Sequence, residues 1–246
     1  MEFVEYPNTG RLFEAQRKVR LGDATTAGRL RLDALMRYAQ DVSDDDTSGM
    51  GLPDDPIWVV RSSSVQVETH AQLSEKLTFS TFCSGIGSRW AERRLTVAGS
   101  YGAKYEISVI WICVDRASLK PTRLTDQFLS IYGQSANNRK VNTKSTIVDH
   151  STFDQSKIKQ IQWNLRTADF DVMSHMNNAA YWSVIENYWI SADSDTSCFV
   201  KIEYGKGVEI SELVEIKQLE QDNFKYFWWI TDKKTAAKAV YAQGDL

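Results

Sequence analysis

Residues 159–181 read KQIQWNLRTADFDVMSHMNNAAY, and this stretch decides how the chain is interpreted. A strand pattern at its start gives way to a polar loop, and an apolar pattern of helical period begins at Tyr181. Asn177 and Asn178 stand just before that helix, where asparagine is a favoured capping residue. We therefore predict a strand, a loop that carries His175, and a helix.

The same order of elements occurs earlier in the chain. Residues 12–116 begin with a strand candidate that ends at Arg20, followed by Asp23, a polar loop and an amphipathic helix. Arg166 and Asp169 lie 146 positions after Arg20 and Asp23. The same shift superposes the apolar faces of the two helices, which carry Leu35, Ala39 and Val42 in the first and Tyr181, Ile185 and Tyr188 in the second.

Four strand candidates follow each helix and are separated by polar or glycine-rich turns. We expect them at 57–69, 76–84, 90–97, 104–115, 198–205, 212–220, 224–231 and 234–243. One helix against an antiparallel sheet, twice, is an α+β arrangement. We expect an N-terminal repeat over 1–116, a connecting segment over 117–158 and a C-terminal repeat over 159–246.

Composition narrows the functional classes. Apolar residues make up 42% and charged residues 25%, as in ordinary globular proteins, and a net charge of −3 argues against a nucleic-acid partner. The three cysteines are far apart, which favours reduced thiols and no metal site. The chain shows neither a signal peptide nor an apolar run long enough to span a membrane, so we expect a cytoplasmic protein. Nucleotide-binding and lipase motifs do not occur, and we expect no cofactor.

Five segments together resemble the acyl-ACP thioesterases, which release fatty acids from acyl carrier protein. They are 35–41, 57–60, 109–115, 169–181 and 202–204. The resemblance implies a tandem (double) hotdog fold, in which each antiparallel sheet wraps one long helix. It further implies that the first repeat shapes the acyl pocket, that the second carries the catalytic loop, and that the partner is acyl carrier protein bearing a fatty acyl chain. A homodimer is left open.

Carried onto this chain, the family signature makes Asp171 and His175 catalytic and places Asn177 and Asn178 at the oxyanion and substrate site. A histidine serves thioester hydrolysis as general base and then as general acid. Asp171 would orient the ring or hold the water, and the helix N-terminus would stabilise the oxyanion through backbone N–H groups. The alternative is that the aspartate and the two asparagines only cap the loop and the helix.

Two positions depart from the family pattern. Met173 stands where the family commonly has asparagine, and Gly207 stands where it commonly has a catalytic glutamate. On a regular strand Glu209 would share the face of Gly207, which makes it a candidate replacement. The departures keep open a catalytically weakened acyl-binding protein. An acyl-CoA thioesterase is a further alternative, as is a hotdog dehydratase, although the tandem match over the full length speaks against the dehydratase.

Docking of the acidic carrier protein requires exposed cations. The basic residues of the connecting segment are candidates, as are Arg89, Arg93 and Arg94. Because Arg93 and Arg94 are adjacent on a predicted strand, they should point to opposite faces, and we expect at least one in solvent. We also expect the acidic run 44–46 at an exposed helix end.

Overall fold

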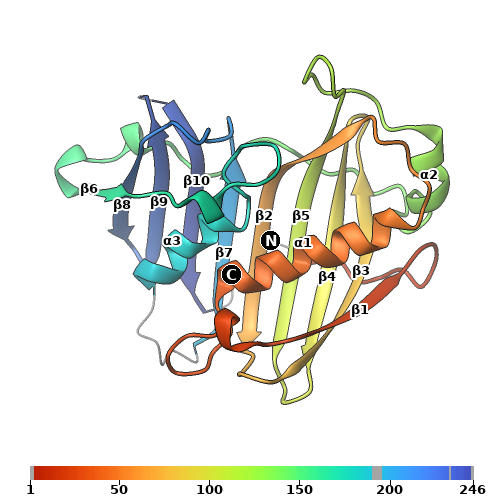
Figure 1. Ribbon diagram of the computed structural model, residues 1–246, viewed down its shortest axis with the longest axis horizontal. Helices are drawn as coiled ribbons and strands as arrows, with labels where there is room; N and C mark the ends of the chain where they lie inside the picture. Colours follow the sequence, from red (N-terminus) through yellow and green to blue (C-terminus); the bar gives the residue numbers. More distant parts are fainter. Residues whose placement is uncertain (1–2, 190–195, 233, 245–246) are drawn as a thin grey trace.

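The computed structural model describes residues 3–189, 196–232 and 234–244, and these contain a single ten-stranded sheet (Figure 1). The strand order is β1-β3-β4-β5-β2-β7-β10-β9-β8-β6. All neighbours pair antiparallel. The strands are β1 (Phe13–Lys18), β2 (Ile57–Thr69), β3 (Lys76–Ile86), β4 (Trp90–Gly99), β5 (Lys104–Val114), β6 (Lys159–Trp163), β7 (Cys198–Tyr204), β8 (Val214–Gln221), β9 (Phe224–Thr231) and β10 (Lys234–Gln243).

Two helices lie on one face of this sheet, one over each half. Helix α1 (Leu32–Ser48) crosses β2 to β5, and α3 (Ala180–Trp189) lies over the strands of the second half (Figure 1). The apolar positions of each helix point to the sheet, as the period of 3.6 predicts. The buried residues include Leu32, Leu35, Met36, Ala39 and Val42 in α1 and Tyr181, Trp182, Val184 and Ile185 in α3. None of the helices within the described ranges is long and apolar enough to cross a membrane.

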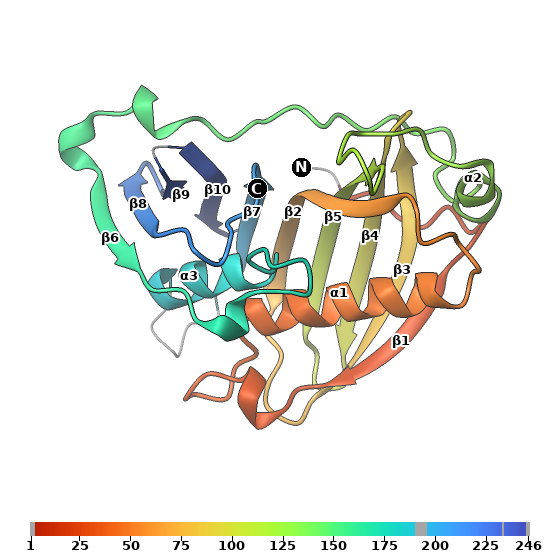
Figure 2. The same cartoon turned by 45° about the horizontal axis from the view of Figure 1, so that its top comes forward.

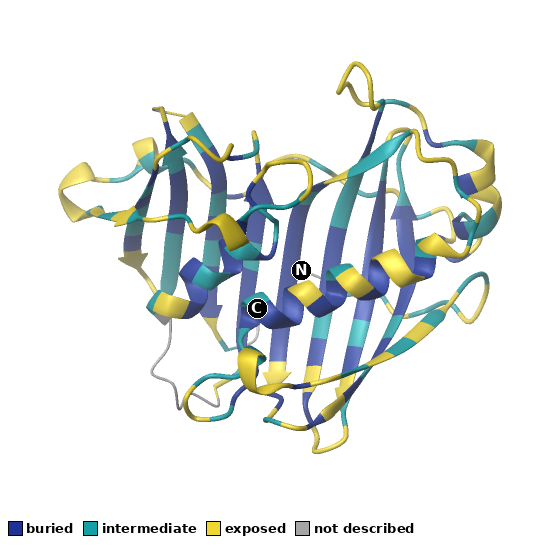
Figure 3. Cartoon of the chain, viewed as in Figure 1, coloured by how far each residue is buried: buried dark blue, intermediate teal, exposed yellow. Residues whose placement is uncertain are grey.

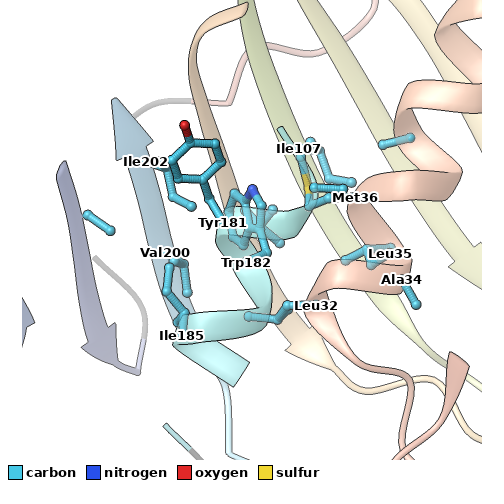
Figure 4. Close-up of a cluster of buried hydrophobic side chains, with 14 of the residues drawn as sticks. Leu32, Ala34, Leu35, Met36, Ile107, Tyr181, Trp182, Ile185, Val200 and Ile202 are labelled. Atoms are coloured by element: carbon cyan, nitrogen blue, oxygen red, sulfur yellow. The ribbon is translucent and has the colours of Figure 1, made fainter. Parts of the chain in front are cut away.

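The two halves share one sheet and one core. Strand β2 pairs with β7 from Ser62 opposite Glu203 to Val67 opposite Cys198. Helices α1 and α3 also meet, because Trp182 packs beside Met36 and Ile107 (Figure 4). The core is therefore continuous across the junction between the halves.

Residues 117–158, which we call the belt, run along the face of the sheet opposite the helices (Figure 2). The belt contains α2 (Asp126–Tyr132) and two short 3₁₀ turns. Its backbone reaches both halves: Trp90 Nε1 donates to the carbonyl of Val141 at 3.1 Å, and Trp228 Nε1 donates to the carbonyl of Val148 at 3.0 Å. The belt explains why several central strands are buried on both faces (Figure 3).

The expected element order, α+β class and antiparallel pairing agree with the structure. Several ends differ by one or two residues. Strand β7 ends at Tyr204 and β8 begins at Val214, so Glu209 lies in the loop between them, as the expected strands 198–205 and 212–220 imply. The condition of a regular strand, under which Glu209 would share the face of Gly207, is therefore not met.

Asp44 and Asp45 are exposed at the end of α1, as expected, but Asp46 is not, and the expectation that Arg93 or Arg94 lies in solvent was wrong. Arg93 and Arg94 are 8% and 3% exposed, and Asp46 is 1% exposed. Arg93 forms an ion pair with Asp46 at 2.5 Å, and Arg94 forms one with Glu106 at 2.5 Å. Both arginines are thus internal structural groups and cannot be docking contacts.

Candidate active site

The loop that precedes α3 is held in a tight turn by its own backbone. Asp171 N–H donates to the carbonyl of His175 at 2.9 Å, and Ser174 N–H donates to the carbonyl of Asp171 at 3.0 Å. Ser174 has φ of +60°, a left-handed conformation that serine seldom adopts. This turn fixes the position at which the chain presents His175.

Asp171 and Asn177 both act as caps. The Asp171 carboxylate accepts the N–H groups of Met173 at 2.9 Å and His175 at 3.4 Å. Asn177 Oδ1 accepts the N–H of Ala179 at 2.9 Å and so satisfies a free donor at the start of α3. In the described residues no hydrogen bond joins the Asp171 carboxylate to the His175 ring. The structure therefore shows Asp171 and Asn177 as capping residues.

The His175 side chain is exposed, and its ring lies against Gly207. A Cβ atom added to Gly207 would lie 3.2 Å from His175 Cγ and 3.3 Å from Cδ2. Gly207 is not in the left-handed region, so close approach of the ring, rather than backbone strain, accounts for a glycine. The neighbouring Met176 N–H donates to the carbonyl of Val208 at 2.8 Å, which keeps the two loops together.

Two carboxylates lie on the loop between β7 and β8. Glu209 pairs with His175 through the backbone, while its carboxylate is 3.8 Å from Lys206 Nζ and largely in solvent. Glu212 is half-buried, and its carboxylate accepts the Glu209 N–H at 2.8 Å. Met173, the other departure from the family signature, is half-exposed, and its N–H donates to the Asp171 carboxylate in the turn.

Buried aromatic residues hold the start of α3 in place. They are Tyr181, Trp182 and Tyr204. Tyr204 Oη accepts the Trp182 indole N–H at 3.0 Å and donates to the carbonyl of Asn178 at 3.2 Å. Burial raises the pKa of the Tyr204 hydroxyl, so this group remains a neutral donor. Burial also raises the pKa of Tyr181, and the nearby carboxylates of Glu212 and Asp171 act in the same direction. The sequence carried no signal for this network, because its members meet only after folding.

Two spaces adjoin the start of α3, and a third lies beside them along α1. A cleft of about 430 Å³ between the helices is lined by Arg31, Arg37, Gln40, Arg166 and Asn177 among others. A narrow space holds Asn178 opposite Gln40, Ser43 and Trp111. A cavity of about 500 Å³ lies between α1 and the first-half strands, with Trp58 and Phe128 on its wall.

Gln40 borders all three spaces, and Ser43 and Trp111 border both the narrow space and the larger cavity. Asn177 borders the cleft and Asn178 borders the narrow space, whereas His175 borders none of the three. Across the described ranges, no group of acidic, histidine or cysteine side chains is placed to hold a metal ion.

Known proteins share this architecture over nearly the whole chain. A putative oleoyl thioesterase from Lactobacillus plantarum has a TM-score of 0.79 at 16% identity, covering 98% of this chain and 99% of that one. The 12:0-ACP thioesterase from Umbellularia californica has a TM-score of 0.75 at 13% identity, covering 97% and 99%. An acyl-ACP thioesterase from Bacteroides thetaiotaomicron has a TM-score of 0.78 at 14% identity, covering 94% and 97%.

Sequence comparison gives the family. An uncharacterised protein of Mycobacterium tuberculosis is 24% identical over 242 residues, which cover 98% of this chain and 95% of the relative. The family model of the acyl-ACP thioesterase N-terminal domain matches residues 10–132, and that of the C-terminal domain matches residues 150–242. With both domain models matched in order over most of its length, the chain belongs to the acyl-ACP thioesterase family of thioester hydrolases.

Proposed function

We propose that the protein hydrolyses the thioester of a fatty acyl chain on acyl carrier protein, in the cytoplasm, with His175 as the general base. His175 takes a proton from water while the water oxygen bonds to the thioester carbonyl carbon. The carbonyl oxygen becomes an oxyanion, which backbone N–H groups at the start of α3 stabilise. The carbon–sulfur bond then breaks, and the proton passes from His175 to the thiol. The products are the free fatty acid and the carrier thiol.

The observation that carries this proposal is the loop of residues 171–178. This loop carries an exposed imidazole and ends at the start of a helix. Asn178 borders the narrow space, which shares Gln40, Ser43 and Trp111 with the cavity of about 500 Å³. Asp171 holds the turn through two backbone bonds and thereby positions the backbone of His175. In addition to capping the turn, the negative charge of Asp171 would orient the His175 ring or hold the attacking water.

The larger cavity is the proposed acyl site. Its volume of about 500 Å³ falls in the ordinary range for small-molecule sites. We propose that the chain runs from Asn178 past Trp111 into this cavity, so that the first half measures the acyl group and the second half cleaves it. This division corresponds to two hotdog repeats, 1–116 and 159–246, joined by the belt.

The proposed partner is acyl carrier protein, an acidic protein that needs exposed cations to dock. Because Arg93 and Arg94 are internal, the remaining candidates are Arg89 and the exposed basic residues of the belt. Those belt residues are Lys120, Arg123, Lys140, Lys144 and Lys157.

The decisive experiment is turnover of matched thioesters by the purified protein. Acyl chains of different lengths are offered on acyl carrier protein and on CoA, with release of free thiol as the readout. His175→Ala should lower kcat by about 10²–10⁴-fold while the melting temperature stays close to that of the parent. His150→Ala, a histidine of the belt that contacts Lys217, is the matched control and should retain activity.

The panel also separates the alternatives. Hydrolysis of CoA thioesters alone would make the protein an acyl-CoA thioesterase. Saturable binding without hydrolysis would make it an acyl-binding protein, as Met173 and Gly207 allow. Loss of water from a 3-hydroxyacyl substrate would make it a dehydratase. A folded His175→Ala protein with undiminished turnover would remove this histidine from the mechanism.

A further inference from the structure

The loop before α1 repeats four backbone hydrogen bonds of the loop before α3. In each bond an N–H donates to a carbonyl, and its counterpart lies 146 positions further along the chain. In the first loop the bonds are Asp23 to Arg20 (3.0 Å), Thr25 to Arg29 (2.7 Å), Gly28 to Thr25 (3.0 Å) and Arg31 to Asp23 (3.0 Å). In the second loop they are, in the same order, Asp169 to Arg166 (2.9 Å), Asp171 to His175 (2.9 Å), Ser174 to Asp171 (3.0 Å) and Asn177 to Asp169 (2.8 Å). The left-handed turn residue is also shared, as Gly28 at φ +88° and Ser174 at φ +60°. Arg29 therefore occupies, in the first loop, the position that His175 occupies in the second.

Equivalent residues of the two helices meet each other. Met36 and Trp182, which are equivalent by the same shift, lie side by side (Figure 4). Leu32 lies four residues before Met36, and Glu186 lies four residues after Trp182. These two residues are in contact. The corresponding pair is Gln40, four residues after Met36, and Asn178, four residues before Trp182. Both border the same narrow space.

The site at the start of α1 is already filled by the protein itself. The Glu186 carboxylate accepts the N–H of Leu32 at 3.0 Å and forms an ion pair with Arg29. Arg29 is 2% exposed and Glu186 is 9% exposed. The negatively charged Glu186 carboxylate thus accepts the first free N–H of α1. The same carboxylate also binds Arg29, the counterpart of His175.

The equivalent position at the start of α3 is open. The N–H of Asn178 donates no hydrogen bond to another residue among those described, whereas its counterpart on Leu32 binds Glu186. On the opposite helix, the residue equivalent to Glu186 is Gln40, which is half-buried and borders all three spaces around the site. Its carboxamide likewise forms no hydrogen bond within the described ranges. The space filled by a carboxylate at one helix is therefore available to a ligand oxygen at the other.

We propose that Gln40 is a catalytic residue that donates its side-chain N–H to the thioester carbonyl oxygen, together with the backbone N–H of Asn178. This inference rests on the proposed hydrolysis. As water adds to the carbonyl carbon, the π electrons move to this oxygen, and two donors aimed at it lower the barrier. A carboxylate at this position would repel the oxyanion, while a carboxamide stabilises it. Helix α1 would thereby supply a side-chain amide that Met173 cannot supply from the loop.

The test compares two changes at this position with acyl-ACP hydrolysis as the readout. Gln40→Met keeps the volume and removes the donor, so kcat should fall by about 10²-fold with little change in KM, because the bond strengthens in the transition state. Gln40→Glu should turn the open site into a copy of the filled one and lower kcat further at neutral pH. Gln16→Met, on the exposed side of β1, is the matched control and should behave as the parent does.

The pH dependence separates a donor from a packing residue. A protonated carboxyl group donates a hydrogen bond, and an ordinary glutamate has a pKa of about 4.3. The rate of Gln40→Glu relative to the parent should therefore rise as pH falls from about 8 toward 5. A purely structural residue would change melting temperature or KM and show no such rise.

The outcomes are distinct from those of the function itself. If the parent does not hydrolyse acyl thioesters, the proposed function fails and this role fails with it. If the parent and Gln16→Met hydrolyse them and Gln40→Met retains full kcat, the function stands and the role of Gln40 is overturned. A Gln40→Glu to parent ratio that is flat with pH would overturn it as well.

Discussion

Asp171 has two separable contributions at the scale of a single side chain. Its carboxylate caps the turn, and its charge lies in the loop that carries His175. Asp171→Asn keeps an oxygen that accepts the same N–H groups, so melting temperature should stay close to the parent while kcat falls about tenfold, which corresponds to about 1.4 kcal/mol. Asp171→Ala should lower both, with a loss of about 1 kcal/mol in stability for the missing cap. Equal rates for the parent and Asp171→Asn would leave only the capping role.

The sequence predicted the capping residues well because capping is local. Asp171 and Asn177 bond to groups two to four residues away, and spacing along the chain is enough to indicate such contacts. The contact between His175 and Gly207 was not predictable in the same way. It joins residues 32 positions apart, and only the fold shows that the imidazole takes the room a side chain would need.

At the scale of elements, α1 and α3 depend on one internal ion pair. Glu186→Ala would leave Arg29 buried without this carboxylate and the Leu32 N–H without its acceptor. We expect it to lower the free energy of unfolding by about 3–5 kcal/mol, as found when one partner of a buried pair is removed. Urea unfolding measures this loss.

A double change provides the control. Arg29→Leu with Glu186→Leu removes both charges and should be more stable than Glu186→Ala, because no buried charge is left alone. A double variant less stable than the single one would mean that Arg29 stabilises the fold mainly through other contacts.

The helices and most strands could be predicted because each has a clear period. The expected strand 57–69 matches β2 residue for residue, and 224–231 matches β9. The role of Glu209 could not be predicted in this way, because it depends on the loop between β7 and β8. Gly205 N–H still donates to the carbonyl of Ala236 on β10, and the chain beyond it turns toward His175, where the carbonyl of Val208 accepts the Met176 N–H.

At the scale of the whole molecule, Glu203 fastens the belt to the sheet. Burial alone would raise its pKa, but hydrogen bonds and charge from Lys201, Ser145 and Thr146 outweigh burial and lower the pKa to about 2. A carboxyl group with a lowered folded pKa stabilises the protein above its unfolded pKa, and this stability is lost as pH falls through the folded value. The difference from the ordinary value of 4.5 is worth about 3 kcal/mol.

We therefore expect stability to decrease from about pH 5 downward, with a large part of the decrease due to this one group. Urea unfolding of the parent and Glu203→Gln over that range measures it. The variant should be less stable at neutral pH and should lose less on acidification. Parallel curves for the two proteins would show that Glu203 is not the responsible group.

The covered back face also explains where prediction from sequence failed. Local patterns assume that one face of an antiparallel sheet meets solvent, which would place one of two adjacent strand residues outside. Here Arg94 is covered by Phe3, whose ring centroid lies 4.5 Å from its guanidinium carbon, and its Nε donates to the carbonyl of Val4 at 3.3 Å. On the other side, Asp46 is enclosed by Arg93, Arg11 and the hydroxyl of Tyr132. Such long-range cover leaves no periodic trace in the sequence.

The filled site beside Arg29 has a consequence for how the chain can change over evolutionary time. In an assembly of two identical subunits, every substitution appears twice, so a site cannot be closed on one side and kept on the other. Fusion into one chain removes that constraint. In this chain one loop presents His175 and the equivalent loop holds the buried Arg29–Glu186 ion pair, so a substitution in one half is not repeated in the other.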